Sequence, residues 1–182
     1  IINAIQVLHD VASGDPNKET TDYRHTRGLI SSITFVKLGY FQSEAFFDET
    51  LTKKLKIKEK YLELADNVLK KWPKDTQKVF IHNKTGDYRK LKIFGKSILL
   101  PTSYYKKQIN YFIKNKQNCF FIFLSDDPDF VENEFSFVEN KLISFNTHFG
   151  TDFAIMTKCQ NAILSPSSFS WWGAYLMENR DT

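Results

Sequence analysis

The segment SPSSFSWWGAYL, residues 165–176, gathers four serines within six positions, directly before a predicted helix. The first amides of a helix lack intrahelical partners and lie at the positive end of its dipole, which suits a phosphate group. Small hydroxyl side chains such as those of Ser167 and Ser168 can approach the same group and donate to it. The pattern favours a phosphate-binding loop. The alternative is that Ser167 or Ser168 only caps the helix and the other serines are loop residues.

A second polar segment, HNKTGDY at residues 82–88, follows a short apolar strand and supplies an imidazole, an ammonium group and a carboxylate. His82 can hydrogen-bond a ribose or a base, and Lys84 can neutralise a phosphate. Asp87 can orient these groups or accept a proton. The alternative is a polar loop in which Gly86 makes the turn.

A third polar segment, SDDPD at residues 125–129, follows a buried strand. Paired aspartates can bind a metal together with a nucleotide diphosphate. However, Asp127 followed by proline is typical of a helix start, so capping accounts for one of the two carboxylates. We therefore expect no metal here, and the histidines of the chain show no metal-ligand spacing.

Short apolar runs alternate with helical patterns in the second part of the chain, and these elements must position the polar segments. The predicted strands are KVFIH, CFFIFL, KLISF and NAILS, and the predicted helices cover residues 100–115, 127–140, 151–159 and 167–179. Four successive strand–helix units predict a parallel sheet with right-handed crossovers, and CFFIFL has the composition of a strand buried on both faces. Ligands of such sheets bind beyond the carboxyl ends of the strands. We therefore expect His82, Ser125 and Ser167 on one rim.

Helical spacing predicts two further features. Tyr105, Ile109, Phe112 and Ile113 form the expected buried face of the helix at 100–115. Trp171 and Trp172 are expected to pack against the sheet, with the following glycine allowing a close approach.

The first part of the chain does not show this alternation of strands and helices. Residues 10–28 form a predicted polar loop, 29–38 are β-rich, 39–49 begin a short aromatic helix, and 56–72 form an amphipathic helix. We expect a division of the chain at residues 76/77, with residues 1–76 as the end of a preceding α/β domain. Because the chain has no initiator Met and stops just past a helix, we expect it to be a piece of a longer protein.

The composition limits the classes of partner that the chain is expected to bind. The chain has 182 residues, a net charge of +4 and 42% hydrophobic residues, which is enough for a packed core. The mild positive charge fits an anionic small ligand or an anionic membrane surface, and no basic cluster is interleaved with aromatics as in a nucleic-acid-binding module. No run of 18 apolar residues or signal peptide is visible. Both cysteines lie in apolar segments and are expected to be free buried thiols.

Five segments occur in a fixed order and together resemble the bacterial α-1,2-fucosyltransferase family, with the adjacent Trp pair as the most specific feature. They are GYFQSEAFF (39–47), HNKTGDY (82–88), LPTSYY (100–105), FFIFLSDDPDFVE (120–132) and SPSSFSWWGAYL (165–176). The resemblance implies a GT-B-like architecture in which residues 77–182 form a Rossmann-like donor domain and residues 1–76 belong to the acceptor side. It implies a metal-independent, inverting transfer of fucose from GDP-fucose to a sugar hydroxyl, usually the 2-hydroxyl of galactose.

The resemblance also implies roles for individual residues. His82 is the expected guanosine contact, Asp152 the expected guanine or ribose reader, and Ser167 and Ser168 the expected diphosphate contacts. Lys84 departs from the family pattern H-x-R-R-G-D.

Lys84 and Thr85 stand where the family has two arginines, the first of which stabilises the departing diphosphate. Lysine keeps the charge but loses the bidentate geometry. Lys84 and Asp87 are the expected catalytic residues, with Glu44 as a second candidate for the base.

Two other functions remain open on this evidence, a nucleotide-sugar-binding protein that has lost catalysis and a glycosyltransferase using another sugar nucleotide. Since nothing directs export, we expect a cytoplasmic protein, with peripheral contact to the inner face of the membrane as an alternative.

Overall fold

The computed structural model describes the backbone of residues 5–8, 25–26 and 33–36, and it describes residues 52, 54–72, 75–93, 95–144 and 148–178, with the side chain of residue 93 left out. The chain forms two compact units, residues 1–55 and 56–182. The helix predicted to begin in residues 39–49, with Glu44, lies outside the described residues. No helix in the described ranges is both long and apolar enough to cross a membrane.

The first unit contains a three-stranded sheet in the order β2-β1-β3. Strands β1 (Ile5–Leu8) and β3 (Ile33–Val36) are parallel, and β2 (His25–Thr26) is antiparallel to β1. Strand β3 confirms the prediction for 29–38. Strand β1 was not predicted, and β2 lies inside the predicted loop.

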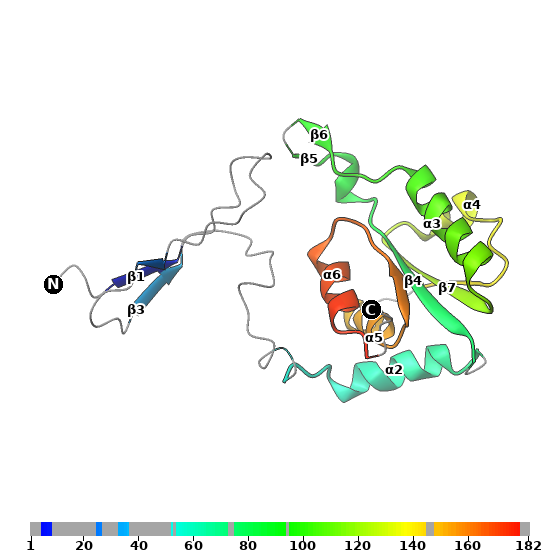
Figure 1. The fold of residues 1–182 in the computed structure, drawn as a ribbon, viewed down its shortest axis with the longest axis horizontal. Coiled ribbons are helices and arrows are strands. Elements are labelled where there is room, and N and C mark those ends of the chain that lie inside the picture. The colour runs from blue at the N-terminus through cyan, green and yellow to red at the C-terminus, as the bar shows by residue number, and fades with distance from the viewer. Residues whose placement is uncertain are drawn as a thin grey trace. The chain divides into compact units, whose positions relative to one another are not determined.

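The second unit is an α/β fold around a parallel sheet (Figure 1). Its main elements are α2 (Glu59–Leu69), β4 (Gln77–Asn83), α3 (Thr102–Asn115), β7 (Cys119–Ser125), α4 (Pro128–Glu134), β8 (Lys141–Ile143), α5 (Phe149–Thr157), β9 (Asn161–Ile163) and α6 (Ser168–Tyr175). The strand order is β8-β7-β4-β9, and every pair is parallel. The predicted parallel sheet and its four strand–helix units are confirmed. Because the chain runs from β4 to β7 and β8 and then returns to β9, the order reverses between β4 and β9.

Helices cover both faces of this sheet. Along β4 and β7, residues that point to one face pack with α3 and α4, and residues that point to the other pack with α2 and α5. The first set includes Val79, Ile81, Phe121 and Phe123, and the second includes Phe80, Phe120, Ile122 and Leu124. Because neither face meets water, the strands read as continuous apolar runs.

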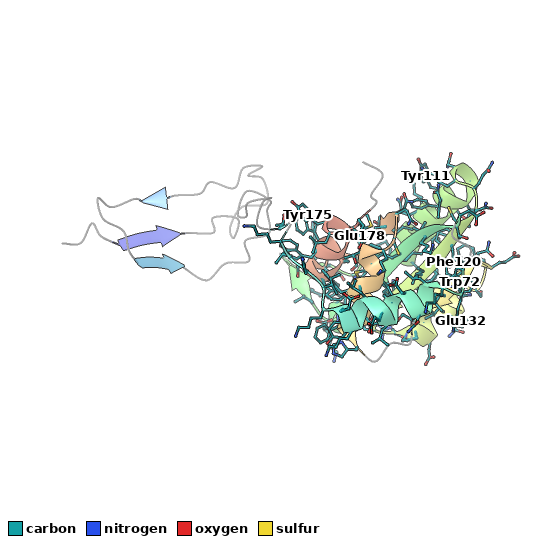
Figure 2. The ribbon with its side chains drawn as sticks, turned by 90° about the horizontal axis from the view of Figure 1, so that it is seen from below. Trp72, Tyr111, Phe120, Glu132, Tyr175 and Glu178 are labelled. Atoms are coloured by element: carbon teal, nitrogen blue, oxygen red, sulfur yellow. The ribbon has the colours of Figure 1, made fainter. Side chains whose placement is uncertain are left out.

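Helix α2 belongs to the second unit. Its Ala65 and Leu69 are buried in the same core as residues of α5. Beyond the helix, Trp72 stacks on Phe120 of β7 with ring centroids 3.9 Å apart (Figure 2). The contact boundary therefore lies at residues 55/56 rather than at the expected 76/77. The assignment of the first part to the acceptor side stays a prediction.

Helix α3 corrects one detail of its predicted buried face. Tyr105 and Ile109 are buried and Phe112 packs against the core, but Ile113 is 51% exposed. Eight residues separate Ile113 from Tyr105, and at 100° per residue the two directions differ by about 80°. Ile113 has therefore rotated off the stripe that faces the sheet.

The connection between β4 and α3 was not predicted in detail. It contains the 3-10 turn η3 (Asp87–Arg89) and an antiparallel ribbon of β5 (Lys92–Ile93) and β6 (Lys96–Ser97). Gly95 makes the turn between the two short strands with a φ of 76°, a conformation that glycine adopts without strain.

Candidate functional site

A pocket of about 340 Å³ lies at the carboxyl ends of the strands. It is lined by His82, Lys84, Leu124, Ser125, Asp126, His148, Phe149, Asp152, Ser167 and Phe169. These residues follow or end all four strands of the sheet, as expected where parallel strands meet at one edge. The prediction that His82, Ser125 and Ser167 share one rim is confirmed. Asp87 and Ser168 are not among the described residues that line the pocket.

The four serines of the 165–170 segment divide into separate roles. Ser165 is buried and its Oγ lies 2.6 Å from Nδ1 of His82. Ser170, also buried, donates its hydroxyl to the Ser165 and Ser167 carbonyls, at 3.2 and 3.1 Å, and so closes the turn. Two of the serines therefore build the loop.

The other two serines stand at the start of α6. Ser167 is the N-cap residue, but within the described residues its side chain makes no capping hydrogen bond, and it faces the pocket. Ser168 begins the first turn and is exposed outside the pocket lining. The capping alternative therefore does not account for the Ser167 hydroxyl, and Ser167 is better placed than Ser168 to meet a ligand.

His82, one residue before the end of β4, is a buried imidazole that lines this pocket, with 8% of its surface exposed. Burial lowers its pKa to about 4, opposed by the nearby Asp126 and assisted by Lys84. The ring is therefore neutral at pH 7. A neutral imidazole held at Nδ1 by Ser165 can hydrogen-bond a ligand without adding charge.

Asp126 organises the loop that follows β4. Its Oδ1 accepts the Thr85 amide at 2.8 Å and the Thr85 hydroxyl at 3.2 Å, and its Oδ2 accepts the Gly86 amide at 3.1 Å. Burial alone would raise the pKa of Asp126, but the Thr85 amide, Lys84 and the Gly86 amide lower it to about 2. A Cβ on Gly86 would lie 2.7 Å from Oδ2, so the glycine permits this close approach. Apart from the strand-end position of Asp126, no sequence pattern indicated this role.

Lys84 is held between two carboxylates. Its Nζ lies 2.9 Å from Asp126 Oδ2 and 2.9 Å from Asp87 Oδ1. The hydrogen bond to Asp126 is the main cause of a raised Lys84 pKa, so the side chain stays charged. One ammonium and two carboxylates give this cluster a net charge of −1. The expected cation is thus present at the pocket, but it is already paired.

The helix-start reading of the SDDPD segment is confirmed. Asp127 caps α4 by accepting the Phe130 amide at 3.1 Å, and its carboxylate also pairs with Arg89. Ser125 donates to the Asn83 carbonyl at 2.7 Å and ties β7 to β4. In the described part of the chain, no group of three or more His, Cys, Asp or Glu residues is arranged to hold a metal ion.

The amino end of α5 also lines the pocket. Asp152 lies in the first turn of this helix and accepts the Ser144 hydroxyl at 2.7 Å. His148 caps the helix because its Nδ1 accepts the Gly150 amide at 2.9 Å. This cap starts α5 two residues before the predicted position. Sequence reasoning missed both His148 and Phe149, because it searched the histidines only for metal spacing.

The tryptophan pair lies on α6 and not in the sheet core. Trp171 stacks on Tyr175 with centroids 5.1 Å apart, and Trp172 meets Trp171 edge-on at 5.1 Å. The α6 residues that pack into the core are others, including Phe169. The expectation that the pair packs against the sheet is therefore wrong. Gly173 does permit a close approach, but to α5 rather than to the sheet, since an added Cβ would lie 2.4 Å from Met156 Sδ.

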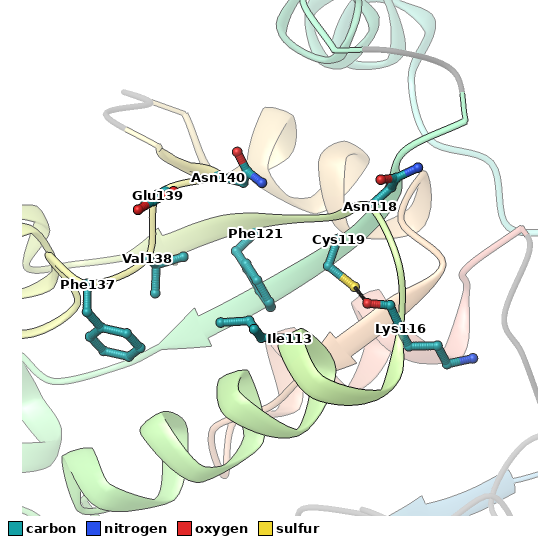
Figure 3. Close-up of a pocket in the computed structure, with 9 residues that line it drawn as sticks. All are labelled: Ile113, Lys116, Asn118, Cys119, Phe121, Phe137, Val138, Glu139 and Asn140. Carbon is teal, nitrogen blue, oxygen red and sulfur yellow. Dashed lines mark hydrogen bonds between the residues drawn. The ribbon is translucent and has the colours of Figure 1, made fainter.

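A larger pocket, of about 410 Å³, lies near the amino end of β7 (Figure 3). It is lined by Ile113, Lys116, Asn118, Cys119, Phe121, Phe137, Val138, Glu139 and Asn140. The Cys119 thiol points to the Lys116 carbonyl at 3.9 Å. Its walls come mainly from the end of α3, the start of β7 and the segment after α4. This pocket is the larger of the two, but of these two only the carboxyl-end pocket gathers loops from all four strands.

Comparison with known proteins agrees with this choice of site. The chain matches the glycosyl transferase family 11 model over residues 6–182. An α-1,2-colitosyltransferase from Escherichia coli is 34% identical over 158 residues, which cover 80% of this chain and 51% of that protein. The O-antigen biosynthesis glycosyltransferase WbnK from Escherichia coli is 34% identical over 103 residues, covering 53% of this chain and 33% of that protein. No solved structure matches the chain significantly.

The chain therefore spans one third to about one half of the length of these two relatives. The family match, by contrast, covers nearly all of it. This extent, with the order of the five segments, shows that the chain belongs to glycosyl transferase family 11, a bacterial α-1,2-fucosyltransferase-like family.

Proposed function

We propose that the protein transfers L-fucose from GDP-fucose to the 2-hydroxyl of galactose in a glycan, with the donor bound at the carboxyl-end pocket of a GT-B-like donor domain. The observation that carries the proposal is the convergence of His82, Asp152 and Ser167, from three separate loops, on one pocket. A nucleotide sugar needs such separate contacts for its base, ribose and diphosphate.

The two sides of the pocket differ in a way that supports an orientation for the donor. Ser167 and the free amides at the start of α6 provide donors and the positive end of a dipole, which suit the diphosphate. His82 is neutral, and Asp152 at the start of α5 is an acceptor, so both suit the guanosine. We propose that Ser168 contributes through its position in the first turn of α6 rather than through its hydroxyl.

The proposed reaction is a single displacement. The acceptor oxygen bonds to the anomeric carbon of fucose while the bond from that carbon to the β-phosphate oxygen breaks, and the electron pair leaves with GDP. The acceptor hydroxyl loses its proton to a base or to water. Negative charge grows on the β-phosphate, so fixed donors aimed at this oxygen lower the barrier. Ser167, the α6 amino terminus and Lys84 are the donors that the pocket provides.

Lys84 and Asp87 act in this proposal as a coupled pair. Lys84 lines the pocket and places a cation beside the diphosphate, while Asp126 and Asp87 fix its position. Asp87 is 69% exposed at its side chain and is bound to Lys84. These contacts favour an orienting role for Asp87 over a role as the base. We propose that the reaction needs no metal.

One relative supports a second donor. The name of the colitosyltransferase states the same α-1,2 linkage as the proposed reaction, and its alignment covers 80% of this chain. A transferase that uses colitose in place of fucose is therefore an alternative. The O-antigen relative supports a glycan acceptor, and we place the reaction in the cytoplasm, with contact to the inner membrane face if the acceptor is lipid-linked.

The paired state of Lys84 supports one further alternative, a nucleotide-sugar-binding protein with weakened catalysis. A transfer assay with the whole protein, GDP-fucose and a β-galactoside separates the three functions. We expect a fucosylated product with a new α-1,2 linkage, detected by mass spectrometry and NMR. Lys84→Ala should lower the turnover by about two decades, roughly the effect of one lost transition-state donor. Transfer from a colitose donor but not from GDP-fucose would support the colitosyltransferase alternative. GDP binding without transfer or donor hydrolysis would support a nucleotide-sugar-binding protein with weakened catalysis.

A further inference from the structure

A large apolar ring stands exposed at the pocket that binds the donor in the proposal above. Phe149, the first residue of α5, is 74% exposed, more than any other large hydrophobic side chain in the described ranges. It lines the same pocket as Asp152 and His82. A single exposed phenylalanine needs no explanation on an ordinary surface. Here its position at a pocket that polar and charged side chains also line, on a fixed support, gives it a specific use.

The support of Phe149 is a histidine whose orientation is fixed. The rings of His148 and Phe149 stack, with centroids 4.7 Å apart and planes inclined by 28°. Nδ1 of His148 accepts the Gly150 amide, so Nε2 carries the hydrogen and donates to the Tyr61 hydroxyl at 3.1 Å. Because both ring nitrogens are bound, the imidazole cannot turn freely.

The ring of Tyr61, from α2, fixes the same support from a second element. It contacts the His148 ring at 4.7 Å, and a Cβ on Gly150 would approach the Tyr61 ring to 2.8 Å. The backbone at the start of α5 therefore lies directly against α2. Phe149 is held by a packed helix end rather than by a free loop, which reduces the entropy lost when a ligand contacts it.

The polar groups around Phe149 match a flat ligand with polar edges. Asp152 lies three residues further along α5, on the same side of the helix as Phe149, and it offers a carboxylate fixed by Ser144. A flat apolar face beside a hydrogen-bond acceptor is complementary to a nucleobase, which stacks through its face and donates through its edge.

We propose that Phe149 is the stacking platform for the nucleobase of the donor, supported by His148 and Tyr61. This inference rests on the proposed function, because it assigns the base of the same nucleotide. It adds a contact with the face of the base, whereas the hydrogen-bonding residues of the pocket contact only its edge. The platform places the base at the start of α5, with the diphosphate toward α6.

The test is calorimetric titration of GDP into the whole protein and into four variants. Phe149→Ala should weaken GDP binding about tenfold or more, the loss expected when a base–aromatic stack is removed. Phe149→Leu keeps the apolar bulk without the flat ring and should show most of this loss, whereas Phe149→Tyr should bind within about twofold. Phe137→Ala is the matched control, because it removes another exposed phenylalanine, at the amino-end pocket, and should bind as the wild type does.

Unchanged GDP affinity in Phe149→Ala would overturn the platform and leave the proposed function standing. Full affinity in Phe149→Leu would also overturn it, since apolar bulk and not stacking would then be sufficient. A raised acceptor KM in Phe149→Ala with unchanged GDP affinity would assign the ring to the acceptor and overturn the inference as well. A wild-type protein that binds no GDP would overturn both the proposed function and the platform.

Discussion

The two ends of the parallel sheet carry pockets of opposite character. The amino-end pocket is the larger, and its walls come mainly from two neighbouring connections around β7. The carboxyl-end pocket is smaller, yet every strand sends at least one polar residue or loop to it. This difference follows from topology, because parallel strands bring all their outgoing loops to one edge. Chemical convergence, rather than volume, therefore identifies the candidate site.

The polar groups of the carboxyl-end pocket are largely fixed by contacts within the protein. At the carboxyl end, the Thr85 and Gly86 amides, Lys84 and His82 are all fixed by partners, while the Ser167 hydroxyl faces the pocket without a capping role. A site prepared in this way keeps its geometry when charge develops. Similar substitutions at the two ends should therefore have different effects.

The largest effect is expected from placing a negative charge where the diphosphate should lie. Ser167→Asp should weaken GDP binding by at least about a hundredfold, because like charges about 4 Å apart repel by about 4 kcal/mol at an effective dielectric constant of about 20. Asn140→Asp adds the same charge at the amino-end pocket and serves as the control. Equal losses in the two variants would show that the effect is not specific to the carboxyl end.

The next effect concerns the pH dependence of stability. The pKa of His82 is lowered to about 4 in the folded state, against an ordinary 6.5, so the unfolded chain binds the proton more readily. Stability from this residue is complete above pH 6.5 and is lost as the pH falls towards 4, by up to about 3 kcal/mol. Chemical denaturation from pH 4 to 8 should show this loss in the wild type but not in His82→Gln. Parallel pH profiles for the two proteins would contradict the burial of a neutral imidazole.

A smaller effect is expected from Asp126→Asn. The amide cannot accept from both backbone amides of the loop and from Lys84, so the free energy of unfolding should fall by about 2 kcal/mol at pH 7. Glu139→Gln makes the same chemical change at the amino-end pocket and should stay within about 0.5 kcal/mol of the wild type. Urea denaturation measures both values. If the two variants are equally stable, Asp126 does not hold the loop.

Features with a local cause could be predicted from the sequence. The run CFFIFL requires cover on both faces and forms β7, and the cap of α4 is visible in Asp127 and the proline that follows it. The order of strands and helices fixes the carboxyl edge, so His82 and Ser167 could be placed on one rim before any coordinates were known.

Features that depend on contacts between residues far apart in the sequence could not be predicted. The hydrogen bonds between Asp126 and Thr85 join residues 41 positions apart, and the hydrogen bond between Tyr61 and His148 joins residues 87 apart. No local pattern encodes either contact. Spacing also could not decide which of the serines faces the pocket, since this depends on Ser170 closing the turn beneath Ser167.

Hydrogen–deuterium exchange of the whole protein, with and without GDP, tests the central claim most directly, because it reports which end of the sheet the nucleotide protects. We expect slower exchange in residues 83–87, 148–152 and 167–170, which surround the carboxyl-end pocket. Residues 116–121 and 137–141, around the amino-end pocket, should exchange at unchanged rates. Protection confined to the amino-end segments would contradict the assignment of the nucleotide-sugar site.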